Sequence, residues 1–146
     1  MDEVLYSERF TIEGNDYEHG GDVAARVKAV LRQFGLDPAA IRRLSIANFE
    51  AEMNVIMYAR RAELLLEVMP QAVRVTLADE GQGIPDLEKA MQEGYSTATP
   101  EMRQRGFGAG LGLPNIKRNT DRFEITSVVG TGTTLRYEVD FAGAAG

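Results

Sequence analysis

The chain has 146 residues, of which 44% are hydrophobic and 26% charged, a composition typical of one soluble globular domain. Its net charge of −6 argues against nucleic acid as a general partner, because phosphate binding requires a basic surface. Cysteine is absent and His19 is the single histidine, which excludes disulfides, thiolate metal sites and histidine-rich metal sites. We interpret His19 as a loop residue without chemistry.

The sequence also predicts where the protein works. No apolar run approaches the roughly 20 residues that span a bilayer, so we expect no membrane partner. The N-terminus is acidic where an export signal has its basic and apolar regions. We therefore expect a cytoplasmic protein that forms one domain over residues 1–146, with an ordered core over about 5–141.

In chain order, alternation over 5–13 predicts a first strand. Asp22 is expected to cap a helix over 23–35 that stops at Gly35. Asp37 at the N-cap and Pro38 at the first helical position predict a second helix over 38–61. We expect its apolar stripe to consist of Ile41, Ile46, Phe49, Met53, Ile56 and Met57.

The second half of the chain predicts two hairpins and two short helices. Strands over 62–68 and 72–79 are joined at 69–71, and strands over 123–129 and 133–141 are joined at 130–132. Helices are expected over 86–94 and 114–122, with a polar, glycine-rich segment over 95–112 between them. This order predicts a two-layer α/β (α+β) sandwich: one mixed, mostly antiparallel sheet with helices on one face.

Two constellations of polar side chains stand out on these elements. Glu50 and Asn54 are four residues apart on the second helix, so they project from nearly the same face and can address one ligand, whereas Glu52 points elsewhere. Asp79 ends a strand, and a carboxylate there can accept a hydrogen bond from an exocyclic amine such as that of adenine. Taken alone, each motif also fits an interpretation without a ligand. Glu50 and Asn54 could belong to a solvated polar stripe of the helix, and Asp79 could lie in a turn and cap the next helix.

The stretch 105–115, RGFGAGLGLPN, has alternating glycines before a helix start. No Gly-Lys-Ser/Thr follows, which excludes a P-loop, and no strand precedes it, which excludes a dinucleotide-binding fingerprint. Backbone amides before a helix form a natural anion site, with a merely flexible loop as the alternative. The segment 130–134, GTGTT, is by itself a hairpin turn.

Together, in this order, the four motifs resemble the N, G1 and G2 boxes of the GHKL (Bergerat-fold) ATPases and kinases, over about residues 5–141. Residues 87–97, 108–118 and 121–125 are similar to those of the anti-sigma factor and switch-protein serine/threonine kinases of bacterial partner switching, in particular the kinase that acts on STAS-domain proteins. The segment 99–108 is similar instead to the sporulation anti-sigma kinase. The chain thus combines features of both branches.

The resemblance implies ATP and Mg²⁺ as cofactors, with Glu50 as general base and Asn54 as the Mg²⁺ ligand. Asp79 would hold the adenine amine, and residues 94–112 would form the ATP lid. The implied nucleotide-binding residues are Asn54, Asp79, Gly81, Gly83, Ile84, Arg105, Gly106, Gly108, Gly110, Leu111, Gly112 and Thr133. Met57 departs from the family, which often has a basic residue there, so a basic phosphate contact must come from elsewhere; the candidates are Arg60, Arg61, Arg103 and Arg105.

The leading functional prediction is a protein kinase that phosphorylates Ser or Thr of a STAS-domain antagonist and regulates a sigma factor or a downstream enzyme such as a phosphatase. A second interpretation is a nucleotide-gated anti-sigma or partner-binding module with weak or no kinase activity, which uses the surface of the first helix and works as a homodimer. A third is an ATPase or nucleotide sensor. A histidine kinase is disfavoured, because Glu50 is present and His19 is the only histidine.

Overall fold

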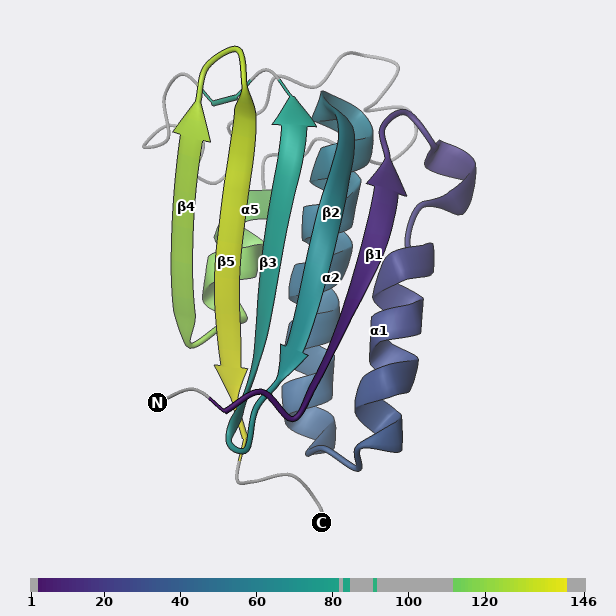
Figure 1. Cartoon of the computed structure of the whole chain (residues 1–146), viewed down its shortest axis with the longest axis vertical. Coiled ribbons are helices and arrows are strands. Elements are labelled where there is room, and N and C mark those ends of the chain that lie inside the picture. Colours follow the sequence, from purple (N-terminus) through teal and green to yellow (C-terminus); the bar gives the residue numbers. More distant parts are fainter. Residues whose placement is uncertain (1–2, 82, 85–90, 92–111, 142–146) are drawn as a thin grey trace.

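The computed structural model describes residues 3–81, 83–84, 91 and 112–141 (Figure 1). The elements in chain order are β1 (Tyr6–Glu13), the short 3₁₀ helix η1 (Tyr17–His19), α1 (Asp22–Gln33), α2 (Pro38–Tyr58), β2 (Ala59–Val68), β3 (Ala72–Gly81), α5 (Gly112–Arg118), β4 (Arg122–Val128) and β5 (Gly132–Asp140). Apart from Met91 and Gly112, the expected helix over 86–94 and the lid over 94–112 lie outside the described residues.

The described strands form one five-stranded sheet in the order β1-β2-β3-β5-β4. Every pairing between these strands is antiparallel, where we expected a mixed, mostly antiparallel sheet. The helices α1, α2 and α5 cover one face of this sheet, which confirms the predicted two-layer sandwich (Figure 1). Because β5 lies between β3 and β4, the end of β3 is brought beside the start of β5, 54 residues further along the chain.

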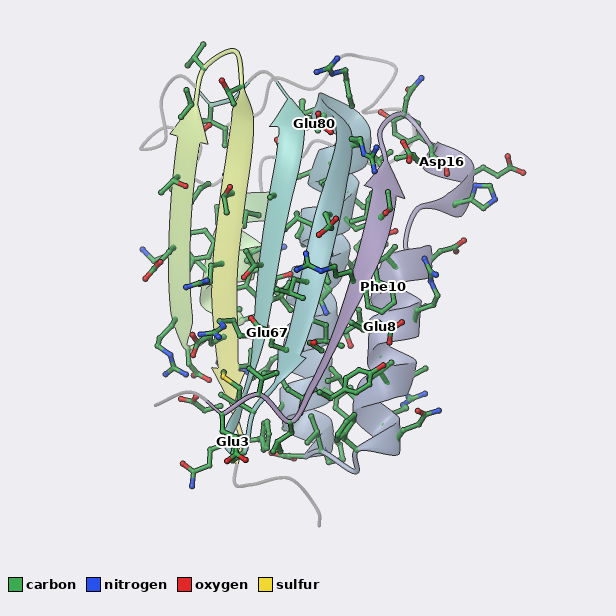
Figure 2. The ribbon with its side chains drawn as sticks, viewed as in Figure 1. Glu3, Glu8, Phe10, Asp16, Glu67 and Glu80 are labelled. Atoms are coloured by element: carbon green, nitrogen blue, oxygen red, sulfur yellow. The ribbon has the colours of Figure 1, made fainter. Side chains whose placement is uncertain are left out.

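The core lies between the sheet and the helices, where strand side chains alternate between the two faces. Phe10 lies between β1 and α1 (Figure 2), with the Arg26 guanidinium carbon 5.3 Å from its ring centroid. Tyr137 of β5 is fully buried and donates a hydrogen bond of 2.6 Å to Asn48 Oδ1 of α2. On the open face, Arg74 pairs with Glu67 at 3.1 Å and so ties β3 to β2. In the part of the chain that the structure describes, no helix is long and apolar enough to cross a bilayer.

The boundaries of α2 confirm one prediction and correct another. Asp37 caps the helix by accepting from the Ala39 N–H at 3.1 Å, with Pro38 in the first turn, as expected. The helix ends at Tyr58, however, so the predicted extension to residue 61 is wrong. Ala59 is extended (φ −120°, ψ 164°) and pairs with Gly81 of β3, so sheet hydrogen bonds replace a last helical turn that local preference alone would favour.

The start of α1 differs from the expected Asp22 cap. Gly21 is the N-cap, in the left-handed region at φ 95°, and no side chain of the cap itself accepts a hydrogen bond. The buried carboxylate of Glu52, which is 2% exposed, accepts instead from the N–H groups of Gly21, Val23 and Ala24 at 3.0, 3.3 and 2.8 Å. Glu52 is therefore a structural residue that joins α2 to the start of α1.

Two further expectations need correction. The apolar stripe of α2 faces the core at Ile41, Met53 and Ile56, but Ile46 and Phe49 are 37% and 41% exposed, so they were wrongly placed in it. The last helix spans 112–118 rather than 114–122, because residue 121 already hydrogen-bonds β5 through its backbone and Arg122 begins β4.

Candidate functional site

Polar side chains from α2, β3, α5 and β5 gather at the end of the sheet where β3 finishes. The end of α2 lies against this edge, because a Cβ atom built on Gly81 would sit 3.2 Å from the Tyr58 carbonyl oxygen. Asn54 is one helical turn, roughly 6 Å of rise, before that point. Glu80 at the end of β3 and Asp16 in the connector after β1 mark the same end of the molecule (Figure 2).

Glu50, Asn54 and Gly112 form the first part of the site. Gly112 begins α5, which packs against α2. A Cβ on Gly112 would lie 3.1 Å from Asn54 Oδ1, 3.3 Å from Asn54 Nδ2 and 3.5 Å from Glu50 Oε2. Only glycine leaves both polar groups unobstructed at this approach. The structure therefore brings together a carboxylate, an amide oxygen and the start of α5. The spacing of Glu50 and Asn54 led us to expect that these two side chains lie together, but it did not predict the approach of α5.

Asp79 and Thr133 form the second part, where β3 meets β5. The Thr133 N–H donates to Asp79 Oδ1 at 2.9 Å, and this bond leaves the carboxylate's second oxygen for another donor. Gly132 allows the contact: it has φ 152°, and a Cβ there would lie 2.0 Å from the Asp79 carbonyl oxygen. Both the positive φ and the close approach to Asp79 require glycine at this position. Asp79 is thus fixed by β5, and the alternative role as a cap of the next helix falls outside the described residues.

Gly83 and Ile84 lie against the β4–β5 hairpin. The Ile84 N–H donates to Ser127 Oγ at 2.7 Å, and Ser127 Oγ lies 2.8 Å from Thr133 Oγ1. Gly83 has φ 77°, and a Cβ there would lie 2.5 Å from the Val128 carbonyl oxygen. Ser127 therefore connects the backbone after Gly81 to the side chain of Thr133.

The two carboxylates of the site share an electrostatic feature. Burial raises the pKa of the Glu50 carboxyl, and a hydrogen bond from the Asn115 side chain opposes that rise. Burial also raises the pKa of the Asp79 carboxyl, and the bond from the Thr133 N–H opposes it. Partly buried carboxyls with shifted pKa values at the edge of a sheet are typical of functional sites.

The other predicted site residues fall into two groups. Arg105, Gly106, Gly108, Gly110 and Leu111 lie outside the described residues, as does Arg103. Of the other two arginines considered for a phosphate contact, Arg60 is exposed at the start of β2, and Arg61 Nε lies 3.6 Å from Glu80 Oε2. Their roles, like those of the other site residues, stay predictions.

The donor set around Gly112 suits a hard cation bound together with phosphate. In the described part of the chain, no group of three or more His, Cys, Asp or Glu could hold a metal by itself. The Asn54 amide oxygen beside Glu50 is an oxygen donor of the kind that Mg²⁺ binds while phosphates and water supply its other ligands. These residues fit a metal that arrives with a nucleotide rather than a resident ion.

Sequence reasoning assigned no individual role to three residues of the site: Asn115, Ser127 and Gly132. Asn115 hydrogen-bonds Glu50 through its side chain. Its Oδ1 also accepts from Arg118 at 2.9 Å, and the three-residue spacing of Asn115 and Arg118 on one helix could have indicated this second contact. Ser127 could not have been found in this way, because its contacts depend on the register between β4, β5 and the end of β3. Gly132 lies in the segment 130–134 singled out above, but its close approach to Asp79 depends on β5 lying beside β3.

The fold and the site together define an ATPase domain of the GHKL type. The model of the histidine kinase-like ATPase domain family matches residues 15–138, and the chain belongs to this family. The predicted recognition is thereby confirmed.

Two relatives indicate to which subfamily of these ATPase domains the chain is similar. The chain is 32% identical over 120 residues to the serine/threonine-protein kinase RsbT of Bacillus subtilis (strain 168), covering 78% of this chain and 84% of that protein. It is 32% identical over 108 residues to an anti-sigma F factor of Caldanaerobacter subterraneus subsp. tengcongensis, covering 69% and 72%. The predicted subfamily, with relatives among both switch kinases and anti-sigma factors, is confirmed.

Two solved structures have the same fold at low identity. The mycobacterial sensor histidine kinase MprB superposes with a TM-score of 0.55 at 14% identity, covering 94% of this chain and 99% of that one. The catalytic domain of the histidine kinase ThkA gives 0.54 at 18% identity, covering 94% and 97%. At such identities the likeness concerns the fold alone.

Proposed function

We propose that the protein is a cytoplasmic serine/threonine protein kinase of a bacterial partner-switching system, which uses Mg-ATP to phosphorylate a STAS-domain antagonist. Its relatives include a serine/threonine-protein kinase and anti-sigma F factors. The observation that carries the proposal is the closeness of Glu50 and Asn54 to Gly112 at the start of α5. This arrangement supports a role for Glu50 as a carboxylate that would act beside bound phosphates. A hydroxyl is a poor nucleophile, and a nearby carboxylate is what its activation requires.

In this proposal, Asp79 recognises the base of the nucleotide. Its carboxylate accepts from the adenine amine with the oxygen that the Thr133 N–H does not occupy. Ser127 holds Thr133 and the Ile84 backbone in place, and Gly81 and Gly83 keep the wall free of side chains. These contacts would position the nucleotide, while Glu50 and Asn54 of α2 would take part in the phosphate transfer.

Glu50 acts as general base and Asn54 as metal ligand. Bound ATP would supply the transferable γ-phosphoryl group, and Mg²⁺ would neutralise part of the charge of the phosphates. The Glu50 carboxylate would accept the proton of the substrate Ser or Thr hydroxyl as that oxygen attacked the γ-phosphorus, and ADP would leave with the bridging oxygen. Asn115 orients Glu50 through its side-chain hydrogen bond. Glycines 106, 108 and 110, with Arg105 and Leu111, would wrap the phosphates as a lid.

A second candidate is a nucleotide-gated module that binds a sigma factor or a phosphatase with little phosphate transfer, as a homodimer. The relatives named anti-sigma F factor favour it. The two candidates make different demands on Glu50, since only the kinase needs a base.

The test uses the Glu50→Ala variant as a substrate trap. Proteins retained from the source cell by this variant in Mg-ATP are identified by mass spectrometry, and each is then incubated with the parent chain and γ-labelled ATP. Labelling of a STAS-domain protein on Ser or Thr supports the kinase. Retention of a sigma factor or another enzyme, with no label transferred by the parent, supports the binding module instead.

A further inference from the structure

A groove of about 830 Å³ runs between α1 and α2 on the helical side of the molecule. The buried side chains of Leu36 and Ile41 form part of its lining, and the exposed side chains of Ile46 and Phe49 flank it. Most large apolar side chains described are buried, so two exposed ones that line one groove are notable. Exposed apolar residues clustered beside polar ones are typical of protein contact surfaces.

The rim of the groove is positively charged. Lys28 and Arg32 of α1 and Arg42 of α2 line it, although the whole chain has a net charge of −6. Lys28 and Arg32 are four residues apart on one helix face, where like charges repel. Five other described arginines each pair with a carboxylate: Arg9, Arg43, Arg61, Arg74 and Arg122. Within the described residues, the three groove cations make no ion pair.

One end of the groove reaches the candidate active site. Glu50 lines it, directly after Phe49 on α2, and the same carboxylate faces Gly112 and Asn54. A protein that lay in the groove would therefore have part of its surface within reach of the residue proposed as base. The groove gives binding energy away from the reacting hydroxyl, which is how kinases hold a flexible acceptor in position.

We propose that this groove docks the protein substrate, through a segment that carries acidic side chains around one exposed apolar residue. The acidic groups meet Lys28, Arg32 and Arg42, and the apolar side chain packs against Ile46 and Phe49. This inference rests on the proposed kinase function and names the surface chemistry of its substrate. It assigns substrate recognition to Lys28, Arg32, Arg42, Ile46 and Phe49, which are not among the proposed nucleotide-binding residues.

The experiment compares the parent with an Arg32→Glu/Arg42→Glu double variant and with Ile46→Ser, using the purified STAS-domain protein from the trapping experiment. Arg136→Glu is the matched control, because Arg136 is an exposed arginine on β5, whose alternation places it on the sheet face away from the helices. Circular dichroism and the thermal midpoint check that each variant folds as the parent does. Phosphorylation is measured against substrate, ATP and salt concentration, and direct binding is measured in ADP.

We expect the charge reversal to raise the KM for the protein substrate at least about tenfold, with kcat and the KM for ATP unchanged. Ile46→Ser raises the same KM, and Arg136→Glu does not. Added salt weakens the parent's binding but hardly affects the double variant, because screening acts on the charges that it has lost.

An unchanged substrate KM and affinity in the groove variants, with the parent still transferring phosphate, would overturn the docking proposal and leave the kinase intact. A groove used by a second copy of the chain would appear as an altered sedimentation coefficient with unchanged KM, and this too would overturn it. If the parent binds the STAS-domain protein without transfer, loss of that binding in the double variant supports docking although the kinase function fails. A parent that neither binds nor phosphorylates it contradicts both.

Discussion

The two glutamates of α2 should have opposite effects when they are removed. Glu52 accepts three backbone N–H groups at the start of α1, and two of the donors, Val23 and Ala24, are buried. Each buried donor left without a partner costs about 1–3 kcal/mol, so Glu52→Ala should lower the free energy of unfolding by about 2–6 kcal/mol. This is a large part of the roughly 5–15 kcal/mol that holds a typical domain folded.

Glu50, two residues earlier, is the matched control. Because burial raises the pKa of the Glu50 carboxyl, its charged form is disfavoured in the folded state, and Glu50→Gln should leave the free energy of unfolding unchanged or slightly higher. The same substitution should slow phosphate transfer about 10²- to 10⁴-fold. Glu52→Gln keeps one acceptor oxygen and should fall between the two, which leaves a measurable variant if Glu52→Ala does not fold.

The assay is urea unfolding followed by far-ultraviolet circular dichroism, with the slope m compared across variants to confirm that the same transition is measured. A loss below about 1 kcal/mol in Glu52→Ala would refute the structural role of Glu52, since it would mean that water satisfies the start of α1 equally well. A loss in Glu50→Gln as large as that in Glu52→Ala would refute the division of roles.

Three further predictions concern the nucleotide site. Asp79→Asn should weaken ATP binding about 10- to 150-fold by calorimetry, the effect of losing a hydrogen bond to a charged acceptor, and an unchanged affinity would contradict its role. Gly112→Ala should push against Asn54 and reduce the Mg²⁺-dependent part of ATP affinity, with little change in EDTA; equal losses in both would count against the metal role. Asn115→Leu removes the bond that holds down the pKa of Glu50, so the acid limb of kcat should move to higher pH, and a limb that stays in place would exclude this contact.

Local signals predicted much of the fold. Asp37 and Pro38 set the start of α2, and the turns at 69–71 and 130–132 gave both hairpins, because capping and turn chemistry act over a few residues. The end of α2 was missed since it is decided by pairing with β3 and β1, which lie far away in the sequence. The cap of α1 was missed for the same reason: Glu52 is 28 to 31 residues from the groups that it binds.

Sequence motifs identified residues of the candidate site, but the packing of the strands and helices determines which of these residues lie together. The four-residue spacing of Glu50 and Asn54 placed them on one helix face, but their closeness to Gly112 depends on how α5 packs on α2. Asp79 was identified at a strand end, whereas its bond to the Thr133 N–H needs β5 beside β3. The helical spacing of apolar residues could not predict that Ile46 and Phe49 are exposed. The same spacing is found whether an apolar helix face lies in the core or lines a surface groove.

The most direct test of the kinase function is a paired measurement on Glu50→Gln, of Mg-ATP binding by calorimetry and of single-turnover phosphate transfer to the STAS-domain protein. We predict that the variant binds Mg-ATP as tightly as the parent and transfers phosphate about 10²- to 10⁴-fold more slowly, as expected for the loss of a general base. Transfer at the parent rate with normal binding would contradict the assignment of Glu50 and, with it, the proposed mechanism.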